Sequence, residues 1–306
     1  MNPVKIIVAG DLLPSENNYS LFEEGNAETL FGKEICQLFS ESDFSIANLE
    51  GPFTDSTSFQ KKDGPGIKAP KATIAGIKNL GLTAVALANN HITDYLQQGI
   101  DDTIAVLRES GIKYVGIAPR KSCSLPVDSH LSFTVEGRRI CVYNVSETFF
   151  NRPTNDMDGA NVYDEWIVLN EIKTLKQLHD FLIVIHHGGA EYLPYPTPQT
   201  RTRFYRMADC GAVLLLHSIP IVLVAKNGIM AHICFMDKAI FYLLVKRNIL
   251  TGLSKDSLLR LLLPMTGSRS IITLLIFRTT YFAMTKYKIY HRSLSGAKNW
   301  ITKNSL

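Results

Sequence analysis

The stretch from Leu87 to Asp94 brings together polar side chains of the kinds that bind metal ions or transfer protons. Asn90 offers a neutral oxygen, His91 a nitrogen ligand or a proton donor, and Asp94 a carboxylate that can orient an imidazole. The apolar run 83–88 before them is typical of a buried strand, and open α/β folds place their sites where such strands end. The same residues also suit an asparagine-capped turn before a helix, so this stretch alone leaves both interpretations open.

Other strand-like segments also end in residues that can bind a metal ion. The further candidate ligands at these ends are Asp11, Asn48, Glu50, His186, His187 and His217. A single histidine after an apolar strand usually has a structural role, but repeated strand ends of this kind favour a shared site. Carboxylate, amide and imidazole donors suit divalent Mn, Fe or Zn, and two ions about 3.5–4 Å apart can activate a water and neutralise phosphate oxygens. We therefore expect convergence at one sheet edge of Asp11, Glu50, Asn90, His91 and His187.

Alternating strand and helix patterns surround these residues and predict an α/β fold with helices on the faces of a sheet. Strands are predicted over 4–11, 43–50, 83–88, 113–117, 131–135, 139–145, 182–185 and 212–216. Helices are predicted over 28–40, 71–80, 97–110, 173–181 and 200–210. The polar segment from Pro52 to Pro70 is predicted to be a long surface loop, of the kind that often serves as a lid or contacts substrate.

The composition limits the class of protein. Five cysteines without paired spacing predict reduced, buried thiols in a reducing compartment (Cys36, Cys123, Cys141, Cys210 and Cys234). The N-terminal residues show no signal peptide, and no run of about 18 apolar residues predicts a membrane span. We therefore expect a cytoplasmic protein. Membrane association remains open, without a span to support it.

Four motifs share an order and spacing with a known family: Gly10-Asp11, Asn48-Leu49-Glu50, Ala88-Asn89-Asn90-His91 with Asp94, and His187-Gly188-Gly189-Ala190-Glu191-Tyr192. They resemble the CapA-type proteins of capsule and poly-γ-glutamate synthesis, in the calcineurin-like metallophosphoesterase superfamily. The resemblance covers about residues 4–218. It implies a layered metallophosphoesterase-like β-sandwich flanked by helices, with an atypical C-terminal segment. It also implies that relatives are often membrane-associated or exported.

The resemblance also implies roles for individual residues. Metal-ligand positions would be Asp11, Glu50, Asn90 and His187, and the pattern of strand ends adds Asn48 and His217. His91 would be the proton donor or phosphate contact, with Asp94 as its carboxylate partner. Two departures stand out: the Asp-x-His start of the superfamily is Asp11-Leu12-Leu13 here, and the final histidine motif stops at His217-Ser218.

The chain changes character after Ser218. Residues 219–306 contain 13 lysines and arginines but only two acidic residues, Asp237 and Asp256. Permissible codons for residues 219–242, read one base out of frame, can spell the family's His-x-His pair and its Gly-Asn-Phe ending. We therefore expect a domain over 1–218 that is incomplete at its C-terminal end, followed by an out-of-frame read-through over 219–306. The alternative is a genuine basic, apolar tail with membrane-surface helices over Leu258–Leu263 and Ile271–Phe277.

These expectations lead to one principal function and two rivals. The chain would be a CapA-type protein that acts on a phosphate-containing or anionic polymer, with one or two divalent ions that are weakly bound here because ligands are missing. It would have metal-dependent phosphoesterase chemistry if active. The first rival is a non-catalytic scaffold or binding component of a capsule-synthesis complex, and the second is a membrane-surface adaptor. A nucleic-acid partner is not expected.

Overall fold

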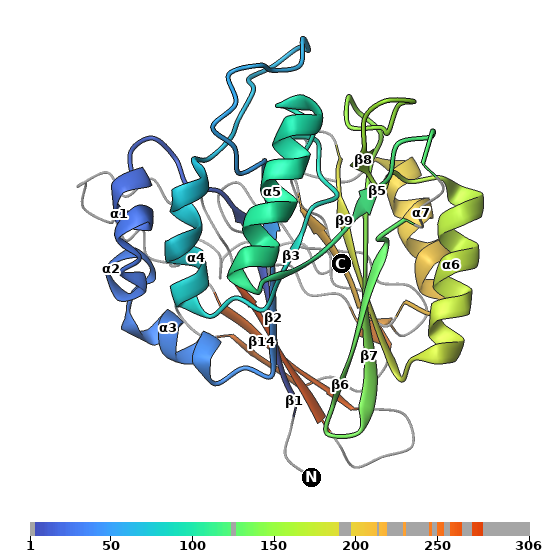
Figure 1. Cartoon of the computed structure of the whole chain (residues 1–306). Helices are drawn as coiled ribbons and strands as arrows, with labels where there is room; N and C mark the ends of the chain where they lie inside the picture. The colour runs from blue at the N-terminus through green and yellow to red at the C-terminus, as the bar shows by residue number, and fades with distance from the viewer. Residues whose placement is uncertain are drawn as a thin grey trace, which may run out of the picture.

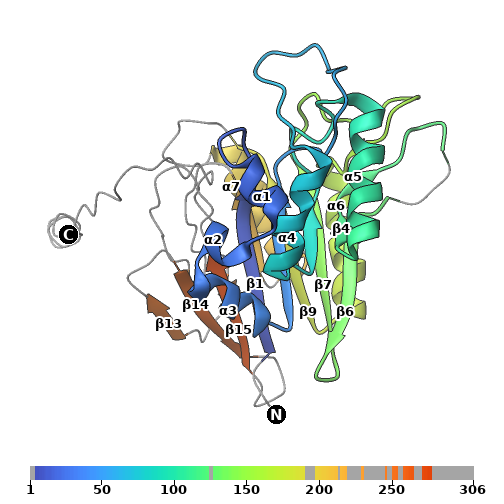
Figure 2. The same ribbon diagram turned by 60° about the vertical axis from the view of Figure 1, so that its left-hand side comes forward.

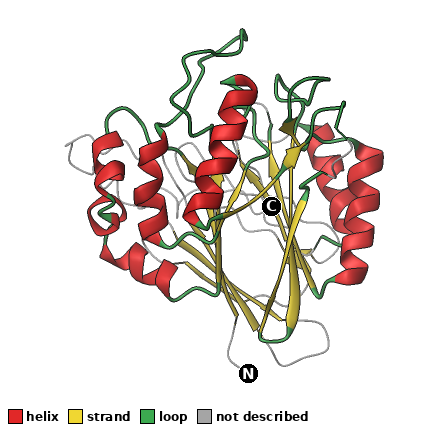
Figure 3. Ribbon diagram, in the orientation of Figure 1, coloured by secondary structure: helices red, strands yellow, loops and turns green. Residues whose placement is uncertain are grey.

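The computed structural model describes residues 4–123, 127–189, 197–212 and 214–218, together with short strands between residues 229 and 277; side chains are described up to residue 212. Within this part, two β-sheets lie face to face and a group of helices covers the outer face of each (Figure 1). The order across the molecule is helices, sheet, sheet, helices (Figure 3). The layered α/β fold expected from the sequence is confirmed.

The first sheet has the strand order β13-β14-β15-β1-β2-β3-β4. Its parallel part contains β1 (Val4–Leu12), β2 (Phe44–Leu49), β3 (Ala84–Ala86) and β4 (Lys113–Val115). Its outer face is covered by α1 (Tyr19–Glu24), α2 (Ala27–Phe31), α3 (Lys33–Ser40), η1 (Lys71–Thr73), α4 (Ile74–Leu80) and α5 (Leu96–Ser110). Because parallel strands point the same way, their carboxyl ends share one edge of the sheet.

The second sheet has the strand order β10-β9-β7-β6. Its strands are β6 (His130–Val135), β7 (Arg138–Ser146), β9 (Phe181–His187) and β10 (Leu214–Ser218). Its outer face is covered by α6 (Glu165–Leu178) and α7 (Pro198–Asp209), and a short pair, β5 (Ile117–Ala118) with β8 (Gly159–Ala160), lies near the site edge. The strands β7, β9 and β10 are parallel, so their carboxyl ends also share an edge.

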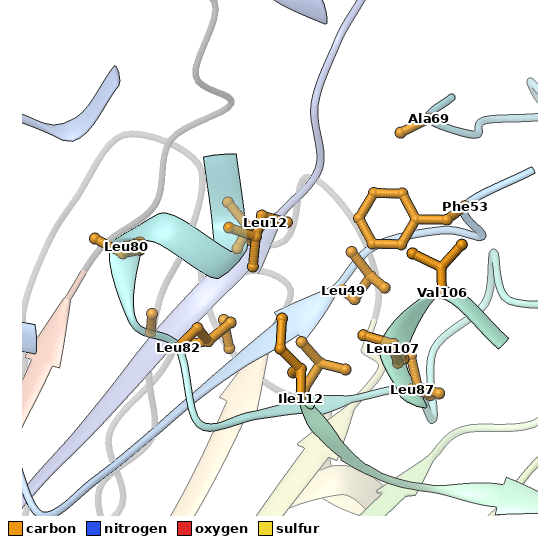
Figure 4. Close-up of a cluster of buried hydrophobic side chains, with 14 of the residues drawn as sticks. Leu12, Leu49, Phe53, Ala69, Leu80, Leu82, Leu87, Val106, Leu107 and Ile112 are labelled. Carbon is orange, nitrogen blue, oxygen red and sulfur yellow. The ribbon is translucent and has the colours of Figure 1, made fainter. Parts of the chain in front are cut away.

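Successive side chains of β1 point to opposite faces of the sheet and so belong to two separate parts of the core. Ile7 and Ala9 face the helices, in a cluster that includes Leu49, Phe53 and Leu107 (Figure 4). The intervening residues of β1 face the second sheet, in a cluster that joins both sheets (Val4, Ile6, Val8, Ile140, Val142, Ile183 and Ile185). Burial of each large aliphatic side chain contributes about 1.5–3 kcal/mol, and this apolar contact holds the layers together.

Two predicted helices differ from the structure. The helix expected over 28–40 is broken at Gly32, whose φ of 86° favours glycine, so α2 and α3 are separate. The helix expected over 173–181 begins earlier, because the Asp164 side chain accepts hydrogen bonds from the backbone N–H groups of Trp166 and Ile167 and starts α6. It also ends earlier, at Leu178, before β9 begins.

The C-terminal segment contributes strands to the first sheet. β13 (Leu250–Leu253), β14 (Leu258–Pro264) and β15 (Ile271–Phe277) continue it beyond β1, and β15 pairs in parallel with β1 (Figure 2). The membrane-surface helices of the alternative interpretation, over Leu258–Leu263 and Ile271–Phe277, are therefore wrong: both segments lie in strands, and β-branched residues at the start of β15 favour a strand. The reading frame of residues 219–306 stays a prediction, which is tested at the level of the gene.

The cysteines only partly follow the expectation. Cys141 is buried, whereas Cys36, Cys123 and Cys210 are half-buried; all four are free thiols. Cys234 lies outside the described residues. No helix of the described part of the chain is both long and apolar enough to cross a bilayer.

Candidate metal centre

The carboxyl ends of strands from both sheets meet at one edge of the molecule, at the top of Figure 1. Asp11 lies near the end of β1, and Glu50 follows β2 directly. Asn90 and His91 follow β3, and His187 is the last residue of β9. The second sheet thus supplies His187, and the first sheet supplies the other four residues.

Three of the predicted ligands come close enough to share one cation. Donor atoms of Asp11, Glu50 and His187 all lie within 4.8 Å of one another. His187 Nε2 is 3.5 Å from Glu50 Oε1 and 2.8 Å from the side-chain oxygen of Asn90. Two carboxylates, an imidazole and an amide oxygen match the ligands that Mn, Fe and Zn accept, so the residues fit such an ion.

The amide of Asn48 lies among these donors. Its nitrogen donates to Asp11 Oδ1 at 2.7 Å and to Glu50 Oε2, and it lies 3.3 Å from His187 Nδ1. Its oxygen accepts a hydrogen bond from the Asn89 amide at 3.2 Å. Asn48 therefore turns its nitrogen, not a ligand oxygen, toward the carboxylates. Its predicted role as a ligand would require the opposite orientation of the amide and stays a prediction.

Burial and mutual repulsion disfavour the charged forms of the two carboxyl groups. Burial raises the pKa of Asp11, although hydrogen bonds from Asn48 and with Glu50 oppose the effect. Burial also raises the pKa of Glu50 well above its ordinary value, and the neighbouring charge of Asp11 raises it further. Two carboxylates in contact, one half-buried and one buried, are stable together when a cation or a proton lies between them. The electrostatics are therefore those of a site that favours positive charge.

His91 and Asp94 form the expected imidazole–carboxylate pair. His91 Nδ1 is 2.7 Å from Asp94 Oδ2, and His91 Nε2 lies 4.0 Å from Glu50 Oε1. Asp94 is fully buried and also accepts hydrogen bonds from the Ile67 backbone N–H at 2.9 Å and from Lys62 Nζ. With Asp94 as acceptor, His91 carries its proton on Nδ1 and presents Nε2 toward the carboxylates.

Two further predicted histidines, His186 and His217, lie on strands of the second sheet. His186 is buried on the opposite face of β9, where its ring packs against Phe204 and Tyr163 under the outer helices. Successive strand residues point to opposite faces, so only one of the two adjacent histidines can face the site. The backbone of His217 pairs with that of His186 in β10. The side chain of His217 lies outside the described residues, as does the Ala190–Tyr192 part of the fourth motif.

Two residues at or beside the site, Lys62 and Glu147, were not predicted from the sequence. Lys62 reaches it from the long loop between β2 and η1, which rises above the site edge (Figure 1). Glu147 follows β7, accepts from the Gly189 N–H at 3.1 Å and pairs with Arg203 at 2.8 Å. Lysine in a polar loop and glutamate after a strand are common, and no local signal marks either one.

Comparison with known proteins gives a family. The pattern of the family described as "Bacterial capsule synthesis protein PGA_cap" matches residues 5–242. A capsule biosynthesis protein CapA of Bacillus anthracis is 26% identical over 235 residues, which cover 72% of this chain and 56% of that protein. A PGA biosynthesis protein CapA of Bacillus subtilis (strain 168) is 26% identical over 218 residues, 70% of this chain and 56% of the relative. The chain thus spans about half the length of the curated relatives it matches.

Among solved structures, one of a novel phosphatase from Mycoplasma pneumoniae aligns with a TM-score of 0.43 and 16% identity, over 79% of this chain and 71% of that chain. A likeness at this level leaves the chemistry of the site to be argued from the chain's own residues. The family match covers well over half of the sequence, and the CapA-type resemblance is thereby confirmed. The chain belongs to the bacterial capsule synthesis protein family, PGA_cap.

Proposed function

We propose that this chain is a CapA-type protein of capsule or poly-γ-glutamate synthesis whose site binds a divalent cation and is built for phosphoester chemistry on an anionic polymer or its precursor. The observation that carries the proposal is the clustering of Asp11, Glu50 and His187, with donor atoms within 4.8 Å of one another. Asn90 would add its oxygen as a fourth ligand. The family supports the biological process, and the donor set supports the metal.

The residues of the chain would divide the chemistry among them. A cation held by Asp11, Glu50, Asn90 and His187 would supply a Lewis acid for a phosphoryl oxygen and lower the pKa of a bound water. His91 lies beside this centre, where its Nε2 can exchange a proton with a leaving or attacking oxygen. Asp94 holds the imidazole in the tautomer required for that exchange, and Lys62 holds Asp94.

Titration of the purified chain with Mn²⁺, followed by electron paramagnetic resonance, tests the metal site. We expect binding that Glu50→Gln removes, because the substitution eliminates one charged ligand. Glu41→Gln is the control, since Glu41 pairs with Lys5 at the surface and is no part of the cluster. Equal Mn²⁺ affinity in the unmodified chain and in Glu50→Gln would refute the assignment of this site.

A non-catalytic scaffold in a capsule-synthesis complex is the second candidate. The nitrogen of Asn48 already donates to both carboxylates, which partly offsets their repulsion when no cation is present. Leu13 also stands where the superfamily pattern has an imidazole. A scaffold would keep its fold and its partners after Glu50→Gln, whereas a metal-dependent enzyme would lose turnover of a generic phosphodiester.

We also propose that a single-nucleotide deletion at codon 218 shifts the reading frame, so that residues 1–218 form a domain incomplete at its C-terminal end. The basic composition of residues 219–306 and the codon argument support this proposal, whereas the pairing of β15 with β1 and the family match as far as residue 242 weigh against it. Ile219 and Ile221 then stand where imidazoles would have been, and metal binding is weak because neither side chain has a donor atom. The adaptor rival would instead bind liposomes through this segment.

Resequencing the gene around codon 218 tests the frame directly. If the proposal is correct, the protein expressed from a gene with one base restored binds Mn²⁺ more tightly and is more soluble than the chain as written. A genomic sequence that confirms the present frame, together with tight Mn²⁺ binding by the unmodified chain, would overturn it. We propose separately that the protein is cytoplasmic, which fractionation of cells that express the chain would test.

A further inference from the structure

The site is assembled from two sheets that are held together mainly by apolar contacts. Asn90 follows a strand of the first sheet, whereas His187 ends a strand of the second. The side chains between the sheets below them are aliphatic and aromatic, such as Val8, Val142 and Ile185. Hydrophobic contact is non-directional, so it does not by itself fix the spacing of two ligands to the accuracy that metal binding needs.

Asn144 provides a directional link across this interface. The side chain lies on β7, is fully buried and bonds to the backbone of both halves of the site. Its oxygen accepts from the Ala88 N–H at 2.8 Å, and its nitrogen donates to the Ile185 carbonyl at 3.1 Å. These partners admit only this orientation of the amide, because an N–H must face the oxygen and a carbonyl must face the nitrogen.

The link lies directly beneath the ligands. Ala88 and Ile185 each come two residues before Asn90 and His187, whose side chains meet at 2.8 Å. The position is tightly enclosed, since a Cβ added at Gly116 would lie 2.1 Å from the side-chain oxygen of Asn144.

A second buried asparagine makes a parallel link. The amide nitrogen of Asn151 donates to the Asn89 carbonyl at 3.0 Å and to Ser146 Oγ at 2.9 Å. Asn89 belongs to the turn that carries His91, and Ser146 ends β7 in the second sheet. The side chain of Asn151 is fully buried. Both asparagines thus tie the backbone of Ala88 and Asn89, next to the first sheet, to strands of the second sheet just below the site.

We propose that Asn144, assisted by Asn151, is a positioning residue that sets the distance between the part of the site from the first sheet and His187 from the second. The importance of this distance for cation binding rests on the proposed function, whereas the positioning of His187 by Asn144 does not. Removal of the Asn144 amide leaves the apolar interface in place and releases the spacing of Asn90 and His187.

The test compares Asn144→Ala with Val142→Ala. Val142 lies on the same strand and in the same interface, so its truncation lowers stability without removing a directional link. Two properties are measured: the ¹⁵N spectrum of histidine-labelled protein without metal, which reports the His187 Nε2–H hydrogen bond, and the affinity for Co²⁺. We expect Asn144→Ala to lose the His187 hydrogen-bond signal and to weaken Co²⁺ binding about 10- to 100-fold. Val142→Ala should keep both.

Each result bears on the inference. A folded Asn144→Ala protein with an unchanged His187 signal would overturn it, as would equal losses of signal in both variants. If Asn144→Ala does not fold, Asn151→Ala is measured in the same way, and an unchanged His187 signal there overturns the proposal. If the unmodified chain binds no Co²⁺, the proposed metal site fails, while the metal-free spectrum still decides whether Asn144 positions His187.

Discussion

Among the described residues, Lys62 is the one lysine or arginine whose side chain contacts Asp94. The substitution Lys62→Met removes this ion pair and changes the aliphatic part of the side chain little. The lysine side chain is 5% exposed and that of Asp94 is 0% exposed, so the pair is buried. The substitution leaves a buried carboxylate with its other donors, the Ile67 N–H and His91 Nδ1. The long loop between β2 and η1 loses one of its anchors to the site.

The expected loss of stability in Lys62→Met follows from the burial of the ion pair. Removing one partner of a buried ion pair destabilises a protein by about 3–5 kcal/mol, because the remaining charge is left uncompensated. Asp94 retains two hydrogen-bond donors, so we expect a loss at the lower end of this range, about 3 kcal/mol. For a domain of this size, about 2–4 °C of melting temperature corresponds to each kcal/mol, so the expected decrease is about 6–12 °C.

Thermal unfolding of Lys62→Met and of Lys71→Met is the assay. Lys71 lies at the end of the same loop, its side chain is 41% exposed, and it pairs with Asp55 at 3.7 Å and Asp102 at 3.6 Å. Each exposed pair contributes about 0–1 kcal/mol, so the loss of both pairs should lower the melting temperature of this control by at most about 8 °C. A decrease in Lys62→Met no larger than that of the control would refute the idea that the buried pair anchors the loop.

Three further predictions concern the site and the close packing around it. Because the pKa of Glu50 lies well above its ordinary 4.5, this group's contribution to the stability of the cation-free protein is full below that pH and is lost as pH rises through the raised pKa. Glu50→Gln should largely flatten this dependence, and melting temperatures in EDTA between about pH 4 and 8 measure it; an unchanged slope would contradict the reasoning. Gly116→Ala should lower the free energy of unfolding, measured in urea, by more than about 3 kcal/mol, because Gly116 has a φ of +107° and the new Cβ would lie 2.1 Å from the side-chain oxygen of Asn144. In the control Gly111→Ala, φ is +74° and no atom lies within 4 Å of the new Cβ, so the free energy of unfolding should fall by about 1 kcal/mol. The chain as written should show little or no phosphodiesterase activity; turnover at a rate abolished by His91→Ala would show that the site is intact.

The sequence predicted the part of the site that depends on strand ends. Apolar runs located the strands, and the first polar residues after each run, such as Asp11, Glu50 and His91, lie where parallel strands converge. Adjacent histidines are harder to separate, because periodicity says that His186 and His187 face opposite sides but not which side is the site.

Long-range and loop contacts could not be predicted in this way. Lys62 reaches Asp94 across 32 positions of the sequence, and no periodic pattern records such a contact. In the sequence, Asn144 is one polar residue inside an apolar strand, and its role depends on two backbone groups from distant segments of the chain. The strand β15 differs from the helix of the alternative interpretation because a short apolar run fits either period, and its pairing partner, β1, lies at the opposite end of the described sequence.

The burial of β9 has a consequence for how the strand finds its register. Every residue of β9 is buried, with Ile183 and Ile185 facing the other sheet and Leu182 and Val184 facing the helices. A slip by one residue would exchange these sets and bury apolar side chains of similar size on both faces, and it would still bring a histidine to the site. Hydrophobicity alone therefore discriminates poorly between the two alignments. The alignment of β9 is therefore selected by the few hydrogen bonds that form in only one of the two alignments, above all the bond from the Asn144 amide to the Ile185 carbonyl.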